Sequence, residues 1–245
     1  MEWSDDALVI STRRHGETSV IASLLSREHG RFAGLVRGGA GKAKRGILQP
    51  GNLVRAQWRA RLPEHLGNFT CEMINPLAAS IMDDAGRLMA LSSACAVCAT
   101  VLPEREAHPS IYDGLLILLE NISVDDWPTI YVKWELGLLG ELGFGLDLSE
   151  CAASGAMEDL IYVSPKSGRA VSKSAGEPYK NKLLHLPSFM LKPTQPAMSM
   201  AEIAQGLALT GFFLKRHAYD ENNTSQPDAR TRFVRSMSKQ ANREL

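Results

Sequence analysis

The sequence of 245 residues has few cysteines, no long hydrophobic run and no excess of one charge. Its four cysteines are too few for a disulfide framework and indicate reduced thiols. The apolar stretch Leu115–Leu119 is far shorter than the roughly 20 residues of a membrane span. The N-terminal residues Glu2, Asp5 and Asp6 are acidic, unlike the basic start of a signal peptide. These absences predict a soluble cytoplasmic protein with no membrane partner.

Motifs of catalysis are missing as well. The glycine-rich segment has Val36 where a phosphate-binding P-loop needs its first glycine, and Ala43 where it needs a hydroxyl. The six histidines form no triad or metal-binding spacing, and no G-x-S-x-G occurs. Paired acids such as Asp83-Asp84 are explained by helix starts and solvated turns. We therefore predict that the protein is not an enzyme and needs no cofactor.

The net charge of zero conceals a segregation of charge along the chain. Residues 1–80 carry eleven basic and seven acidic side chains, residues 81–160 carry three and fourteen, and residues 161–245 carry thirteen and six. The net charges of these thirds are +4, −11 and +7. Such asymmetry predicts a field that steers a charged polymer to one part of the molecule.

The first 75 residues alternate between short strand patterns and turns. The predicted strands are Ala7–Arg14, Thr18–Ser26, Arg31–Arg37, Leu53–Arg61 and Asn68–Ile74. In the fourth strand Trp58 lies on an apolar face, and Arg55 and Arg59 lie on the opposite, cationic face. Five short strands in this length predict a small OB-type β-barrel, which we assign to residues 1–80.

From about residue 81 the apolar spacing becomes that of helices, so we assign a mainly helical domain to residues 81–245. A first helix is predicted from Ile81 to a point before Pro103. A second is predicted with Ser110 as its N-cap, and a third over Asp126–Gly143. The fold class is therefore α+β.

The C-terminal part contains one further strong helix signal. Ser199 and Glu202 form a capping box for a helix that is predicted to run to about His217. A polar linker at Asn222–Pro227 is predicted to lead to a short basic tail.

Residues 144–187 interrupt the helices with a segment rich in Gly, Ser and Pro, around a predicted hairpin at Leu160–Ser172. Cys151-x-x-Ser154 and Ser172-x-x-Ala175 have the spacing of a four-cysteine zinc ribbon in which three ligands are replaced. One thiolate does not hold zinc. We therefore predict a degenerate zinc-ribbon-like insertion without metal, held by the packing of its hairpin.

Gly30–Pro63 is the most informative segment because it contains eight basic residues and no acid. Its part from residue 37 to residue 45 is predicted to be a flexible glycine loop that follows a phosphate backbone. Phe32 and Trp58 could stack on bases, but their apolar-facing positions favour the barrel core. An ordinary solvated face is the alternative explanation of the charges. The predicted nucleic-acid-binding residues are Arg31, Arg37, Lys42, Lys44, Arg45, Arg55, Arg59 and Arg61.

Several short motifs occur in an order that is typical of one family. Glu28-His29-Gly30-Arg31-x-x-Gly34-Leu35-Val36-Arg37-Gly38 is followed by Leu48-Gln49-Pro50. Gly143-Phe144-Gly145-Leu146-Asp147-Leu148 precedes Cys151, and Leu209-x-x-x-Phe213-Leu214 comes later. Over nearly the whole chain, this series resembles RecO, a family of bacterial recombination mediators. The sequence departs from the zinc-binding members of the family at the three replaced ligand positions.

The resemblance implies a bacterial, nucleoid-associated DNA repair protein that binds single- and double-stranded DNA and anneals complementary strands. It also implies that RecR is a partner and that the two proteins help to load the recombinase RecA onto DNA coated by single-stranded DNA-binding protein. The family binds the acidic, apolar-ended C-terminal tail of that coating protein on its helical domain. The residues that match this role are Phe212, Phe213, Lys215 and Arg216, although cations late in a helix also favour its dipole.

Two other functions are open at this point. An RNA- or ribosome-associated OB protein would use the same stacking and phosphate contacts, and competition between RNA and DNA would identify it. A nuclease would use the clustered acids around a divalent ion, and a metal titration would detect it.

Overall fold

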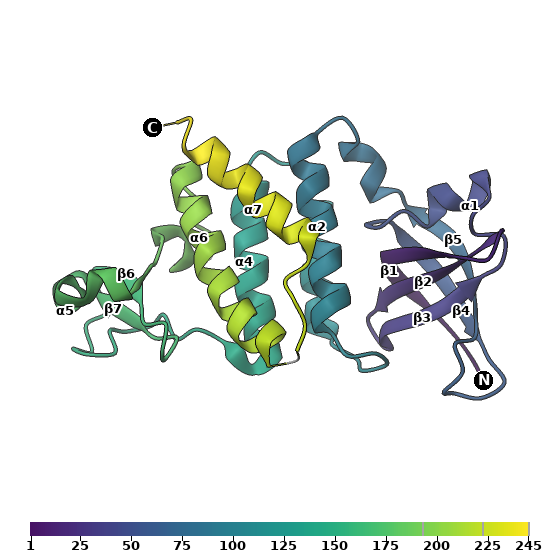
Figure 1. The fold of residues 1–245 in the computed structure, drawn as a ribbon, viewed down its shortest axis with the longest axis horizontal. Helices are drawn as coiled ribbons and strands as arrows, with labels where there is room; N and C mark the ends of the chain where they lie inside the picture. Colours follow the sequence, from purple (N-terminus) through teal and green to yellow (C-terminus); the bar gives the residue numbers. More distant parts are fainter. Residues whose placement is uncertain (193, 222, 245) are drawn as a thin grey trace. The chain divides into compact units, whose positions relative to one another are not determined.

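In the computed structural model, which describes residues 1–192, 194–221 and 223–244, the chain forms two compact units. The first comprises Met1–Ser123 and Pro227–Arg230, and the second comprises Val124–Gln226 and Thr231–Leu245. A β-barrel occupies the start of the first unit, and the remaining elements are mainly helices, which confirms the α+β fold class (Figure 1). The two helices that follow residue 80 belong to the same compact unit as the barrel.

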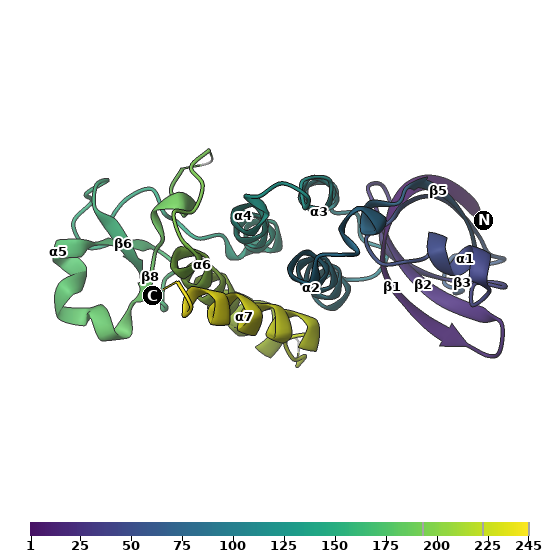
Figure 2. The same ribbon diagram turned by 90° about the horizontal axis from the view of Figure 1, so that it is seen from above.

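Five strands form the barrel, in the closed order β1-β2-β3-β5-β4. All neighbouring pairs are antiparallel except β3 and β5, which run parallel. Figure 2 shows the strands curving into a ring. The prediction of five strands is confirmed; the largest difference is that the first begins at Glu2, because its start pairs with β4. The bounds are β1 (Glu2–His15), β2 (Ser19–Ser26), β3 (Gly30–Val36), β4 (Leu53–Arg59) and β5 (Asn68–Asn75).

The barrel core is built around aromatic side chains. Phe32, Trp58 and Phe69 are buried, and Trp3 packs against them. The indole N–H of Trp58 donates to the backbone oxygen of Leu66 at 2.9 Å, which satisfies the one polar group of the ring. These contacts favour the core interpretation of Phe32 and Trp58 over base stacking.

A short helix replaces the flexible loop that we predicted after β3. Lys42–Ile47 forms α1, and the next residue, Leu48, is buried among the barrel core residues. The turn before the helix is fixed because the Ala40 N–H donates to the Thr18 oxygen at 2.9 Å. Gly38 adopts a φ of 68°, which a side chain would disfavour. The predicted open loop was therefore wrong for residues 42–47, which form a helix that the buried Leu48 anchors to the barrel.

The helices of the first unit pack on the barrel. η1 (Leu77–Ile81) is a 3₁₀ turn, α2 (Ala85–Val101) contacts β1, and α3 (Pro109–Glu120) contacts β2. The predicted first helix thus begins later than expected, with the Asp84 carboxylate accepting from the Arg87 N–H at 3.0 Å. Ser110 is not an N-cap, because Pro109 already occupies the first helical turn, a position that suits its missing N–H.

In the second unit, α4 (Trp127–Leu139) packs against α6 (Met200–Phe213). Asp126 precedes α4 as expected, but the α-helix ends before Gly143 and continues as the π turn η2 (Gly140–Phe144). The predicted N-cap is confirmed, since the Ser199 hydroxyl accepts from the Glu202 N–H at 3.3 Å. The Glu202 carboxylate accepts from the Met198 N–H at 2.6 Å, one residue before the position that a full capping box uses. A π turn, η5 (Leu214–Asp220), follows α6.

The predicted hairpin is present in the insertion as β6 and β7, and a third strand completes a sheet of order β7-β6-β8.

Asn222, where the predicted linker begins, lies outside the described residues. The predicted basic tail forms a helix, in which Phe233 packs against Tyr131 with ring centroids 4.5 Å apart. No helix within the described ranges has the length and apolarity needed to cross a bilayer. The remaining elements are β6 (Leu160–Val163), β7 (Ala170–Ser172), α5 (Lys173–Gly176), η3 (Glu177–Lys182), β8 (Leu184–His185), η4 (Ser188–Met190) and α7 (Asp228–Ala241).

Candidate nucleic-acid interface

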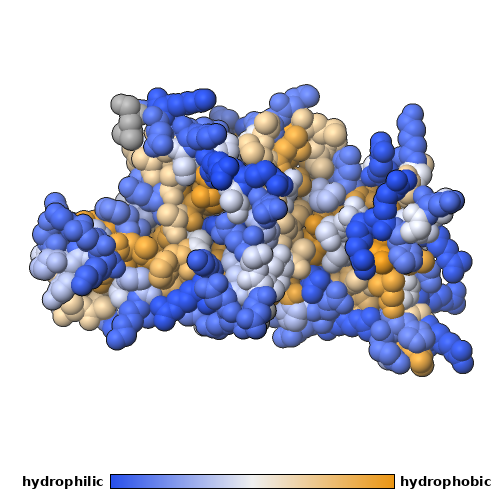
Figure 3. Space-filling model, viewed as in Figure 1, coloured by the Kyte–Doolittle hydropathy of each residue, from blue (hydrophilic) through white to orange (hydrophobic). Residues whose placement is uncertain are grey.

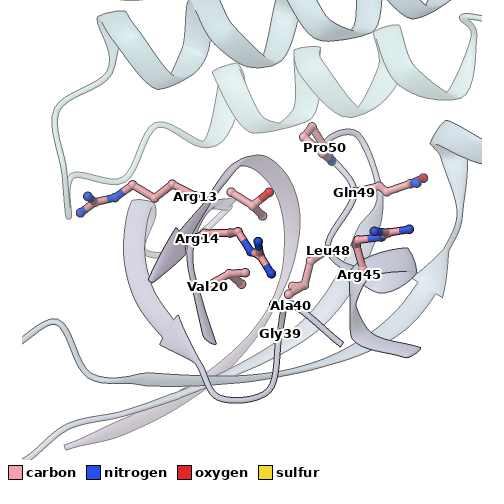
Figure 4. A pocket seen from close by; sticks show the side chains of 10 residues that line it. Arg13, Arg14, Val20, Gly39, Ala40, Arg45, Leu48, Gln49 and Pro50 are labelled. Carbon is pink, nitrogen blue, oxygen red and sulfur yellow. The ribbon is translucent and has the colours of Figure 1, made fainter. Parts of the chain in front are cut away.

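The barrel surface beside α1 gathers basic residues from two distant segments. Arg13 and Arg14 lie at the end of β1, and Arg45 lies on α1. All three residues border one cavity of about 410 Å³, which the Arg14 and Arg45 side chains flank while the Arg13 side chain extends away from it (Figure 4). Lys42 and Lys44 are exposed on the same helix. Figure 3 shows hydrophilic side chains projecting around the barrel, with small apolar areas between them.

These cations are free of acidic partners. The ion pairs found within the described ranges involve none of Arg13, Arg14, Lys42, Lys44 and Arg45. Lys44 instead donates from Nζ to the backbone oxygen of Arg37 at 2.9 Å. A positive charge that no carboxylate neutralises is available to a phosphate.

A second depression, of about 480 Å³, lies on the barrel beside the start of β5. Arg59, Arg61 and Asn68 are among its lining residues. Arg37 donates from Nε to the Asn68 side-chain oxygen at 3.2 Å, so it borders this depression. Lys44, bonded to the Arg37 backbone, connects the two depressions through α1. We call the exposed basic residues along this path the basic strip: Arg14, Arg45, Lys42, Lys44, Arg37 and Arg61.

The outer face of β4 is less cationic than the sequence predicted. β1 pairs with β4 in a register that places Asp6 opposite Arg55 and Glu2 opposite Arg59. The Arg55 guanidinium lies 2.5 Å from the Asp6 carboxylate, and the Arg59 guanidinium lies 3.3 Å from Glu2. The acids come from a strand outside the acid-free segment, so counting charges along that segment missed them.

Arg31 is held by the protein itself. Its Nε donates to the Leu102 backbone oxygen at 2.7 Å, and a terminal nitrogen lies 3.3 Å from a Glu104 carboxylate oxygen. Its side chain is mostly buried. Arg31 therefore ties β3 to the segment after α2, and the structure does not bring it together with the basic strip.

Arg13 and Arg14 were missed by the sequence analysis. The weak signal that could have found them is their position directly before the turn at His15-Gly16, where a strand projects beyond the sheet. The pairing of Arg14 with Val20 confirms that β1 and β2 remain a hairpin up to this turn. The hairpin end thus carries two exposed guanidinium groups to the surface next to α1.

The candidate partner-binding residues are only partly brought together. Phe212 is 37% exposed, whereas Phe213 is 2% exposed and packs beside the His217 ring. Lys215 is exposed, and Arg216 donates to the Pro165 oxygen at 2.6 Å, which ties η5 to the turn of the hairpin. Phe212, Lys215 and Arg216 can therefore meet a partner directly, but Phe213 contributes to the core.

Cys151 is 1% exposed and lies beside β7. Its sulfur accepts from the Ser172 N–H at 3.2 Å. Burial opposes ionisation of Cys151, but the hydroxyls of Ser154 and Ser172 and the N–H groups of Ser172 and Ala153 stabilise the thiolate and lower its pKa to about 6. Hydroxyls thus stand at two positions that a zinc ribbon gives to ligands. The ranges that the structure describes contain no group of three or more His, Cys, Asp or Glu that could hold a metal.

Comparison with known proteins matches both parts of the chain. Residues 1–77 match the family described as Recombination protein O N terminal, and residues 82–226 match Recombination protein O C terminal. A DNA repair protein RecO of Rhodospirillum centenum is 52% identical over 236 residues, which are 96% of this chain and 94% of that protein. The DNA repair protein RecO of Rhodospirillum rubrum is 48% identical, over 96% of this chain and 95% of its own length. That of Mesorhizobium japonicum is 45% identical, over 98% and 94%.

Proposed function

The chain belongs to the RecO family of DNA repair proteins, and from this premise we propose that it binds single- and double-stranded DNA through the basic strip and anneals complementary strands. In this role it acts with RecR and helps to load RecA onto DNA coated by single-stranded DNA-binding protein. It works in the cytoplasm, on the bacterial nucleoid, as a mediator and not as an enzyme.

The observation that carries this proposal is the group of cations without acidic partners around α1. Phosphate contacts release the condensed counterions of DNA, and this release favours binding without reference to sequence. Arg45 and Lys44 are exposed on a helix that the buried Leu48 fixes to the barrel. The backbone that carries these cations is therefore positioned before DNA arrives, so only their side chains are ordered on binding, which lowers the entropic cost.

Annealing follows from the same electrostatics. Two strands repel each other through their phosphates, and a cationic surface that neutralises both lowers that repulsion. Phe32 and Trp58 are buried and hold no bases, so most bases of each strand stay free to find their complements. No bond is made or broken in this process.

The proposed contact with the acidic tail of single-stranded DNA-binding protein uses the second unit. Lys215 and Arg216 supply positive charge, and the exposed ring of Phe212 supplies an apolar surface next to them. An acidic peptide with an apolar end is bound best by a surface that offers positive charge beside an apolar contact. Phe213 supports the surface from below through its edge contact with Phe212, at a centroid distance of 5.2 Å.

Fluorescence anisotropy of labelled oligonucleotides across a salt series tests DNA binding. Replacement of Lys42, Lys44 and Arg45 by Ala should weaken binding and reduce the salt slope on single strands by about 2, at about 0.7 for each lost phosphate contact. Replacement of Lys166, Lys173 and Lys182, three exposed cations of the insertion, is the control for an equal loss of charge. Equal effects of the two triple variants would contradict the proposal. Tighter binding of the matching RNA strand would favour an RNA-associated function instead.

A further inference from the structure

Arg14, one cation of the basic strip, projects from the face of the sheet that carries the barrel core. Arg14 pairs with Val20 in the β1–β2 register, and directly paired residues project from the same face of a sheet. Val20 belongs to the barrel core. Arg13, its neighbour in sequence, projects from the opposite face. Figure 4 shows Arg14 directed over the cavity and Arg13 extending away from it.

The cavity below Arg14 combines an apolar floor with a cationic rim. Val20 and Leu48, both buried, and the partly buried Ala40 and Pro50 line it together with the exposed guanidinium of Arg45. Its volume of about 410 Å³ is in the range of small-molecule sites. A site that bound only the phosphates of a strand would need the cationic rim but not the apolar floor.

The walls of the cavity are fixed by close packing. A Cβ at Gly39 would lie 2.5 Å from the Val20 side chain, so the backbone passes directly against the floor. The Ala40 N–H donates to the Thr18 oxygen, and the Arg45 N–H donates to the Gly41 oxygen at 2.9 Å. These bonds join the hairpin end to α1, so Arg14 and Arg45 face one cavity although they come from different elements.

We propose that this cavity receives one unstacked nucleotide of single-stranded DNA, with its base between the apolar floor and the Arg14 guanidinium and its phosphate on Arg45. The proposal rests on the DNA binding proposed above and adds a site for the base to it. A planar guanidinium stacks on the face of any base, so the site accepts all four bases.

Preference for single strands follows from this arrangement. The bases of duplex DNA are paired and stacked, and removing one from the helix has a free-energy cost that a single strand does not have to meet. Duplex DNA can therefore bind the basic strip through its phosphates but cannot fill the cavity. The cavity would release strands once they have annealed, because the product loses the contact that each single strand had.

Comparing the affinities of two ligands that have the same phosphates but differ in their bases distinguishes a base site from simple charge neutralisation. One is a short thymidylate oligonucleotide, and the other is an abasic strand of the same length. Wild-type protein should bind the thymidylate strand about tenfold more tightly, as expected for one stacked base. Arg14→Ala should abolish this difference, and Arg13→Ala, which removes the same charge one residue away, should preserve it while weakening both ligands.

Arg14→Lys is a second variant, for the case that Arg14→Ala loses binding only because it does not fold. It retains the positive charge and the aliphatic stem, so it should bind the abasic strand like wild type and lose only the preference for bases. An equal preference for the thymidylate strand in wild type, Arg14→Ala and Arg14→Lys would overturn the base site and leave the proposed DNA binding intact. Failure of the wild-type protein to bind either strand would overturn both.

Discussion

The guanidinium of Arg55 lies 2.5 Å from the carboxylate of Asp6, across the pair of strands β1 and β4. The two side chains are 54% and 41% exposed, so the ion pair contributes at most about 1 kcal/mol to stability. Its larger effect is on binding, because it neutralises a cation on the surface of the barrel. Arg45, in contrast, has no such partner within the described ranges.

Asp6→Asn should therefore strengthen DNA binding. Without the carboxylate, Arg55 is free to contact a phosphate, and the salt slope on single strands should increase by up to about 0.7. Anisotropy titrations at several salt concentrations measure this change. Asp113→Asn is the matched control, because Asp113 pairs with Arg27 on another part of the barrel surface. Unchanged or weaker binding by Asp6→Asn would show that Arg55 does not reach DNA.

Trp58→Ala should destabilise the protein by about 3–5 kcal/mol, because it leaves a cavity in the aromatic core. Trp58 is 2% exposed and contacts Phe32 at a centroid distance of 5.0 Å. Urea unfolding measures the loss, and Tyr179→Ala, at a residue that is 61% exposed, should change stability by less than about 0.5 kcal/mol. A stable Trp58→Ala variant that loses DNA binding would instead assign Trp58 to base stacking.

Local patterns predicted the elements that depend on neighbours in sequence. The alternation of Trp58 with Arg55 and Arg59 correctly identified the two faces of β4, because side-chain direction repeats every two residues. Ser199 and Glu202 located the start of α6, because a capping box is complete within four residues.

Local sequence patterns could not predict the contacts between segments that are distant in the chain. The pairing of Asp6 with Arg55 depends on the register of β1 against β4. The cavity depends on Arg14 meeting α1, which is too short to show helical periodicity and is held by the burial of Leu48. The composition of Gly30–Pro63 thus indicated a nucleic-acid surface, but only the barrel shows which cations remain unpaired.

Stability should depend on pH through Cys151. Its folded pKa of about 6 lies below its ordinary value of 9.0, so the folded protein releases a proton that the unfolded chain still binds. The contribution of the thiolate is complete above the ordinary value and disappears as the pH falls through about 6. The stability difference between wild type and Cys151→Ala should therefore grow from pH 6 to pH 9.

Ultraviolet absorbance of the thiolate gives an independent measure of the same group. Wild type should show a titration step near pH 6, and Cys151→Ala should lack it. Cys71→Ala should retain the step, because burial raises the pKa of Cys71 to about 11. A step in wild type that persists in Cys151→Ala would contradict this account.

Phe212 and Phe213 should respond differently to replacement by Ala. Phe213 is buried, so its loss should destabilise the protein by about 3–5 kcal/mol. Phe212→Ala should cost clearly less stability, because Phe212 is 37% exposed, and should weaken binding of a peptide with the tail sequence of single-stranded DNA-binding protein by about tenfold, as expected when one aromatic anchor is lost. Calorimetric titration of the peptide measures the affinity. Full affinity in a folded Phe212→Ala variant would place the tail elsewhere.

The central claim is that the basic strip brings complementary strands together, and strand annealing tests it most directly. Fluorescence follows the annealing of two complementary strands coated by single-stranded DNA-binding protein, without nucleotide or metal, across a salt series. Wild type should accelerate annealing, the acceleration should fall steeply with salt, and the Lys42, Lys44 and Arg45 triple Ala variant should lose most of it. Annealing that is as fast with the triple variant as with wild type, or as fast without protein, would contradict the account.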